Sequence, residues 1–156
     1  MTGIQLSLLG GEQQARTSDD YYTPRWIFDT MGITFDLDVA CPPEGPINVP
    51  AARYYTALDD GLAQPWHGRV WMNPPYSKPA PWVDKWLEHG NGMALLPVNG
   101  GKWCKTLWES NAKGVWLSRL AFVRNGQETT GSPLNIVLWA LGDKNIEAIS
   151  KLGRPR

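Results

Sequence analysis

Short apolar runs alternate with amphipathic stretches along the chain, and this alternation restricts the folds open to it more than any other feature. Strand-like runs lie at residues 33–39, 69–72, 93–98, 115–117 and 134–141. Helical patterns occupy the residues after Pro24 and the ranges 81–89, 102–111 and 143–151. Strands and helices in alternation predict an α/β fold, with a mostly parallel sheet and helices on both of its faces.

Helix-boundary residues punctuate these segments. Thr23 suits the N-cap of the first helix and Pro24 its first helical position, while Gly32 is expected to end it. We expect Trp26, Ile27 and Met31 to face inward from this helix. Asp143 is the expected N-cap of the last helix.

Length and composition are those of one globular domain. The 156 residues are expected to form a flexible N-terminal arm at 1–20 and one domain at 21–156. Two cysteines, Cys41 and Cys104, stand far apart, which argues against a zinc site or a disulfide framework. Because no signal peptide or long apolar run is present, we expect a cytoplasmic protein.

Charge is unevenly distributed although the net charge is zero. Residues 1–75 carry 4 Lys/Arg against 9 Asp/Glu, and residues 76–156 carry 11 against 6. A basic second half can mark a face that contacts phosphates, although a solvated mixed surface explains the same asymmetry. The candidates for phosphate contact are Lys78, Lys85, Lys102 and Lys105, together with the polar loop 124–133.

The strongest chemical signal is Asn73-Pro74-Pro75-Tyr76, directly after a predicted strand. Two successive prolines stiffen the backbone and remove two N–H donors. The Asn73 side chain and the Pro74 carbonyl then offer two oxygen acceptors on a rigid segment. Such a pair suits an amino group with two N–H donors, and Tyr76 offers a ring on which a flipped-out base can stack.

Methylation of an exocyclic amine needs this arrangement. The nitrogen lone pair is delocalised into the base, so the amine is a poor nucleophile. Acceptors that hold its hydrogens localise the lone pair and stabilise the positive charge that develops on the nitrogen. The motif therefore favours a methyltransferase, and by itself it leaves adenine N6, cytosine N4, adenine in RNA and the amide of a protein glutamine open.

Beyond this motif, the chain resembles the phage-type DNA N6-adenine methyltransferases, a Dam-like family, over roughly residues 20–142. The matching segments are Tyr22-Thr23-Pro24, Phe35-Asp36-Leu37-Asp38-Val39-Ala40, Arg53-Tyr54-Tyr55-Thr56, Asp60-Gly61-Leu62, Trp66, 70–77, Trp82-Val83, Leu95-Leu96-Pro97-Val98, Lys102-Trp103 and Leu120-Ala121-Phe122. The resemblance implies a single-domain class I methyltransferase (Rossmann-like) fold, DNA as substrate, a bacterial host cell and S-adenosyl-L-methionine as methyl donor. It assigns catalysis to Asn73, Pro74, Pro75 and Tyr76.

The same resemblance implies where the cofactor binds. Thr23 and Pro24 match a cofactor-binding segment, whose helix start offers free N–H groups to a carboxylate. Asp38 and Ala40 stand in the first cofactor loop, although Asp38 could instead serve local backbone donors. Asp59 or Asp60 is expected to bind the adenine or ribose. The glycine-rich loop that usually follows the first strand is absent here.

One alternative of another class remains. A non-catalytic nucleic-acid-binding module would also use a basic half and many aromatic side chains. Such a module has no need of an intact Asn-Pro-Pro-Tyr, and saturable cofactor binding separates the two hypotheses. No oligomeric state follows from the sequence.

Overall fold

The computed structural model describes residues 23–117, 123–124, 127–128 and 135–156. The arm expected at 1–20 and most of the loop at 124–133 lie outside these residues. In this region, β7 (Val123–Arg124) pairs antiparallel with β8 (Gln127–Glu128).

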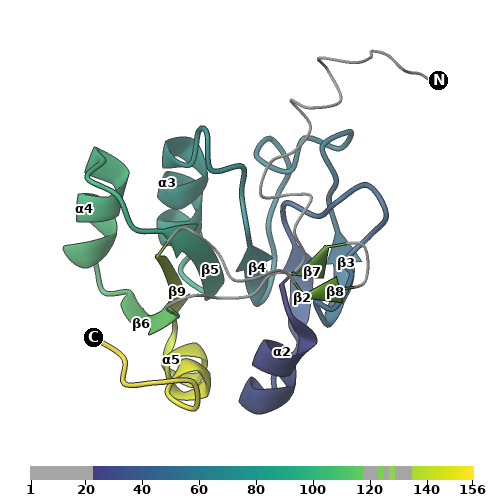
Figure 1. Ribbon diagram of the computed structural model, residues 1–156. Coiled ribbons are helices and arrows are strands. Elements are labelled where there is room, and N and C mark those ends of the chain that lie inside the picture. Colours follow the sequence, from purple (N-terminus) through teal and green to yellow (C-terminus); the bar gives the residue numbers. More distant parts are fainter. Residues whose placement is uncertain (1–22, 118–122, 125–126, 129–134) are drawn as a thin grey trace.

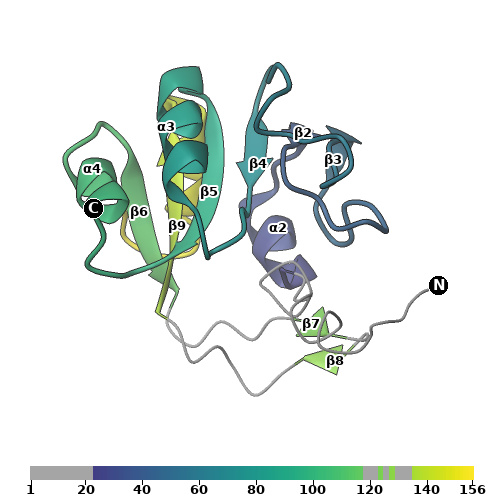
Figure 2. The same cartoon turned by 90° about the horizontal axis from the view of Figure 1, so that it is seen from above.

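A six-stranded sheet organises the chain, in the order β3-β2-β4-β5-β9-β6. Its strands are β2 (Phe35–Asp38), β3 (Ala51–Tyr54), β4 (Val70–Met72), β5 (Gly92–Pro97), β6 (Lys113–Leu117) and β9 (Ile136–Leu141). Figure 2 presents this order across the sheet, from β6 on the left to β3 on the right.

The sheet is mixed, and the prediction of a mostly parallel sheet is wrong in this respect. The pairings β2–β3, β2–β4 and β4–β5 are parallel, whereas β9 runs antiparallel to both β5 and β6. Parallel neighbours need a crossover, usually a helix, and the described residues between β6 and β9 include none. The arrangement is consistent with a Rossmann-like α/β fold.

Helices cover both faces of the sheet, as predicted (Figure 1). One face carries α2 (Arg25–Met31) and α5 (Asp143–Ile149), and the other carries α3 (Ala80–His89) and α4 (Lys102–Trp108). Gly32 and Gly90 end α2 and α3 in the left-handed conformation, with φ of 64° and 76°. Glycine adopts this conformation without a steric penalty, which explains why these ends are readable in the sequence.

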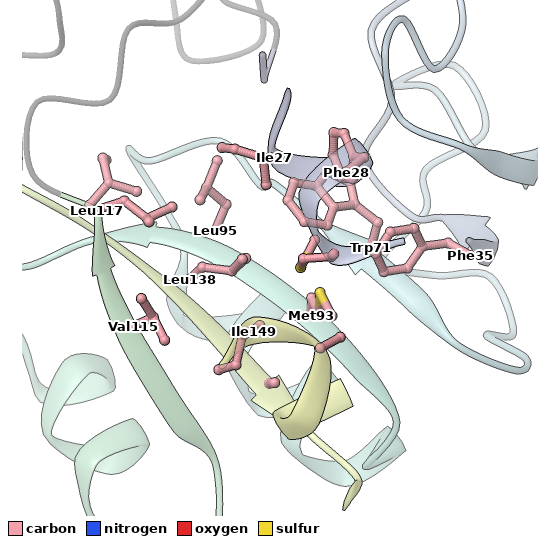
Figure 3. Close-up of a cluster of buried hydrophobic side chains, with 14 residues drawn as sticks. Ile27, Phe28, Phe35, Trp71, Met93, Leu95, Val115, Leu117, Leu138 and Ile149 are labelled. Carbon is pink, nitrogen blue, oxygen red and sulfur yellow. The ribbon is translucent and has the colours of Figure 1, made fainter. Parts of the chain in front are cut away.

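Alternating strand residues feed two hydrophobic clusters, one on each face. The cluster under α2 and α5 includes Trp71, Met93 and Leu95 (Figure 3). The cluster under α3 and α4 includes their neighbours Val70, Met72, Ala94 and Leu96. Side chains on both faces are buried, so the central strands read as continuous apolar runs.

Three predicted helix details are wrong. Pro24, not Thr23, is the N-cap of α2, and no side chain caps this helix. Trp26 is 48% exposed, and Phe28 takes the inward position because its ring packs against Trp71, 4.8 Å between centroids. The N-cap of α5 is Gly142, which leaves Asp143 in the first helical turn.

A network of polar side chains closes the end of the sheet at which the parallel strands β4 and β5 begin. Arg69 Nε donates to Asn145 Oδ1 at 2.6 Å, and Asn145 Nδ2 donates to Asn91 Oδ1 at 2.8 Å and to the Leu141 carbonyl at 2.6 Å. Asn145 is 1% exposed, so these bonds satisfy a buried amide. This end of the sheet is stabilised internally, and the predicted site residues lie at the other end.

Candidate active site

Asn73 directly follows β4, at the carboxyl edge of the parallel strands. Trp71 packs in the cluster under α2, so the two-residue period of the strand carries Asn73 to the same side of the sheet. Open α/β sheets bind their ligands beyond this edge.

The amide oxygen of Asn73 is buried, and it accepts no hydrogen bond from the part of the chain that the structure describes. Leaving a buried acceptor unpaired costs about 1–3 kcal/mol. Folded proteins leave few such groups, and those that remain call for an explanation, often a functional one. An acceptor of this kind is available for an N–H donor that a ligand brings.

The rest of the motif is held firmly. Pro74 is buried and Pro75 half-buried, and the Pro75 carbonyl accepts from the Lys78 N–H at 3.4 Å. Tyr76 is half-buried, packs against the α2-side cluster, and its hydroxyl donates to the Leu95 carbonyl at 3.1 Å. The hydroxyl therefore anchors the ring to the backbone of β5, a role that the motif alone did not suggest.

Asp38 ends β2 beside β4 and is 2% exposed. Its Oδ1 accepts from the Ala40 N–H at 3.2 Å, so the local role weighed from the sequence is present. Leu37 and Val39 both pack in the α3-side cluster, which turns Asp38 between them toward α2.

An irregularity in β2 sets this orientation. Phe35 and Leu37 are two residues apart, yet they pack in clusters on opposite faces of the sheet. The N–H groups of Asp36 and Leu37 both donate to the Arg69 carbonyl, at 2.8 and 3.4 Å, as in a β-bulge. The bulge reverses the alternation and directs Asp38 to the same side as Asn73.

Thr23 and Pro24 lead into α2 on that same face, and both are buried. The Thr23 carbonyl accepts from Asn48 Nδ2 at 3.0 Å, which fixes this segment to the loop that follows β2. In Figure 3, Ile27 of the first turn of α2 lies toward Leu95 of β5. The start of α2 thus lies toward the carboxyl edge.

Asp59 and Asp60 lie in an exposed turn that approaches β2 through Gly61. A Cβ on Gly61 would lie 2.1 Å from the Val39 carbonyl oxygen, so only glycine allows this close approach. Asp59 Oδ2 accepts from the Thr56 N–H at 2.8 Å and from its hydroxyl at 3.2 Å. The Asp60 carboxylate has no such partner among the described residues, and Asp60 has a φ of 56°.

The predicted site residues therefore form two groups at one edge. Asn73, Tyr76, Asp38, Thr23 and Pro24 lie on the α2 side, and the Asp59–Asp60 turn reaches the end of β2. A separate open pocket of about 620 Å³ lies over the edge strand β3. It is lined by Leu37, Ala52, Arg53, Tyr54, Tyr55, Pro65 and His67, none of which was a predicted site residue.

Lys85 was grouped with possible phosphate-contacting lysines, and the structure gives it another role. Its Nζ donates to the carbonyls of Leu62 at 2.8 Å and Gln64 at 2.5 Å. Lys78 and Lys102 are exposed, and Lys105 pairs with Glu109 at 3.8 Å. Sequence spacing held no signal for the contact of Lys85, since its partners lie 21 and 23 residues away.

The described residues contain no group of three or more His, Cys, Asp or Glu side chains placed to hold a metal ion. No described helix is both long and apolar enough to span a bilayer.

Fold and site together define an α/β protein, consistent with a Rossmann-like fold, that presents a buried amide acceptor at the carboxyl edge of its sheet. Residues 11–142 match the family described as DNA N-6-adenine-methyltransferase (Dam). The chain is 33% identical over 138 residues to a DNA N-6-adenine-methyltransferase of Haemophilus phage HP1 (strain HP1c1), covering 78% of each protein. A DNA N-6-adenine-methyltransferase of Escherichia phage T1 is 31% identical over 90 residues, or 53% of this chain and 37% of that relative. The chain belongs to the DNA N-6-adenine-methyltransferase family.

Proposed function

We propose that this protein transfers a methyl group from S-adenosyl-L-methionine to N6 of adenine in DNA. The observation that carries the proposal is the buried Oδ1 of Asn73, which accepts no hydrogen bond from the described residues and lies within the family match at residues 11–142. The proposal places the catalytic domain at residues 21–156 and the reaction in the cytoplasm of a bacterial host.

Asn73 acts on the target amine directly. Its Oδ1 accepts one N–H of the amino group and so gains the partner that the described residues do not provide. Holding that hydrogen localises the nitrogen lone pair and stabilises the charge that develops as the new N–C bond forms. The carbonyl of Pro74 is the proposed second acceptor, on a backbone stiffened by two prolines.

Tyr76 positions the base. Its hydroxyl is bonded to the Leu95 carbonyl, which limits the orientations open to the ring. We propose that the exposed part of this ring stacks on the target adenine after the base leaves the duplex. A ring that is already anchored loses little further rotamer freedom when the base binds.

The residues at the edge suit the methyl donor. S-adenosyl-L-methionine supplies an electrophilic methyl on a sulfonium, which leaves as a neutral thioether while the amine loses a proton. Asp38, buried and turned toward the α2 face, would accept from the amino group of the donor, with Ala40 beside it. Thr23 and Pro24, at the start of α2, would hold its carboxylate.

Of the two aspartates in the turn, Asp60 is the better cofactor ligand. Asp59 already accepts two hydrogen bonds from Thr56, so its carboxylate shapes the turn. The Asp60 carboxylate, which has no hydrogen-bond partner among the described residues, would accept from the adenine or ribose of the cofactor.

Incubation of the purified protein with unmethylated DNA and labelled S-adenosyl-L-methionine tests the proposal. Mass spectrometry of the digested DNA is expected to find N6-methyladenine and no N4-methylcytosine. Parallel incubations with RNA and with a glutamine-containing protein cover the other amine substrates of the same motif. DNA binding without label transfer to any substrate would identify a non-catalytic module instead.

A further inference from the structure

Lys85 joins helix α3 to the loop that carries the Asp59–Asp60 turn. Two of the three N–H donors of its ammonium group are used by the carbonyls of Leu62 and Gln64. Hydrogen bonds from a charged donor contribute more to stability than bonds between neutral groups. The side chain is half-buried, and its charge is directed into the protein.

An indole pair reinforces this junction. Lys85 Nζ lies 5.1 Å from the centre of the Trp66 ring, within the range of a cation–π contact. Trp66 stacks on Trp82, 6.3 Å between centroids and 26° between planes. Trp82 and Lys85 are three residues apart on α3 and so share one helix face.

The same loop is tied back to the turn. Trp66 Nε1 donates to the Gly61 carbonyl at 2.8 Å, and Gln64 Nε2 donates to the Asp59 carbonyl at 2.8 Å. Gly61 in turn lies against the Val39 carbonyl at the end of β2. A chain of contacts therefore leads from Lys85 through Trp66 and Gln64 to the backbone beside Asp60.

We infer that Lys85 is a positioning residue for the methyl donor, because it holds the Asp59–Gly61 turn against the end of β2. This inference rests on the proposed function, in which Asp60 binds the cofactor. Lys85 itself touches neither the cofactor nor DNA. Its loss leaves Asp60 chemically intact and lets the turn move, so the affinity for the cofactor falls while the chemical step survives.

Lys85→Met is the test, since it removes the three donors and keeps a long apolar stem. We expect the Kd and KM for S-adenosyl-L-methionine to rise about tenfold, with kcat at saturating cofactor within about twofold of wild type. Calorimetry gives the Kd without turnover. Lys85→Arg, which retains charge and donors, is expected to restore most of the affinity.

Two further variants separate this effect from other causes. Lys144→Met removes an equal charge from an exposed position on α5 and is expected to change neither the Kd nor the KM for S-adenosyl-L-methionine. Trp66→Phe keeps an aromatic ring but removes the donor to Gly61 and part of the surface stacked on Trp82, so it is expected to weaken cofactor binding in the same direction.

Measuring DNA affinity at several salt concentrations tests whether Lys85 contacts a phosphate instead. If Lys85 contacts a phosphate, Lys85→Met would reduce the salt slope of log affinity by about one and leave the cofactor Kd unchanged, which would overturn the inference. Equal losses in kcat, cofactor affinity and DNA affinity would also overturn it, because they indicate general unfolding. A wild-type protein that neither binds the cofactor nor methylates DNA would instead overturn the proposed function, and this inference with it.

Discussion

Replacing Asn73 by alanine is expected to separate stability from activity. Asn73 Oδ1 is buried without a donor among the described residues, so the folded protein carries an unsatisfied acceptor. Removing it relieves a penalty of about 1–3 kcal/mol, against which stands the packing of one half-buried side chain. We expect Asn73→Ala to be as stable as wild type, or more stable by about 1 kcal/mol.

The same change is expected to lower activity sharply. Loss of one oriented group of this kind reduces kcat by about a hundred- to a thousandfold. Asn73→Asp is the matched variant, because it keeps an oxygen at the same place. It is expected to retain more activity than alanine, and to be less stable than wild type because a buried carboxylate lacks partners.

Thermal unfolding of wild type, Asn73→Ala and Asn73→Asp checks the expected order of stability. Single-turnover methylation by the same three proteins checks the expected order of activity. For a chain of this size, 1 kcal/mol corresponds to a shift in Tm of about 2–4 °C. An alanine variant that unfolds several degrees below wild type would refute the reasoning, since the amide would then be a satisfied structural group. Near-normal turnover by the same variant would refute the catalytic role.

Three other predictions concern the base, the cofactor and the DNA backbone. Tyr76→Phe loses the hydrogen bond to Leu95, so it is expected to be less stable by about 1 kcal/mol and to keep most activity. Tyr76→Ala is expected to weaken productive DNA binding by about 1–3 kcal/mol as well. Unfolding and methylation assays separate the two effects. Asp60→Asn is expected to leave the Tm unchanged, because asparagine tolerates the positive φ, and to raise the cofactor Kd measured by calorimetry about tenfold. A larger effect of Asp59→Asn on this Kd would contradict the assignment. Log DNA affinity is expected to fall linearly with log salt despite the zero net charge, and a flat response in anisotropy titrations would exclude a phosphate-contacting face.

Tyr76 can combine a structural contact with the proposed contact to the base. Its motif predicted a ring on which a flipped-out base can stack. The ring packs against the cluster that contains Trp71, and its hydroxyl is bonded to β5. The ring is only half-buried, so anchoring and stacking are compatible, and the stacking role stays a prediction.

Several elements of the fold were predictable from residues that lie close together in the sequence. The apolar runs of β4, β5 and β9, and the glycines that end α2 and α3, are readable because each depends on residues a few positions apart. The Asn73–Tyr76 motif was readable for the same reason, since its chemistry lies in four consecutive residues.

Contacts between distant segments required the tertiary structure. An apolar run has no direction, so the antiparallel placement of β9 between β5 and β6 was not predictable from its pattern. The turn of Asp38 toward α2 depends on a bulge formed with Arg69, and the unpaired state of Asn73 Oδ1 depends on every group around it. The inward direction of Lys85 has the same origin, because its partners come from a loop more than 20 residues away. The sequence determined which chemical groups the protein possesses, and packing across the sheet decided which of them are paired and which remain available.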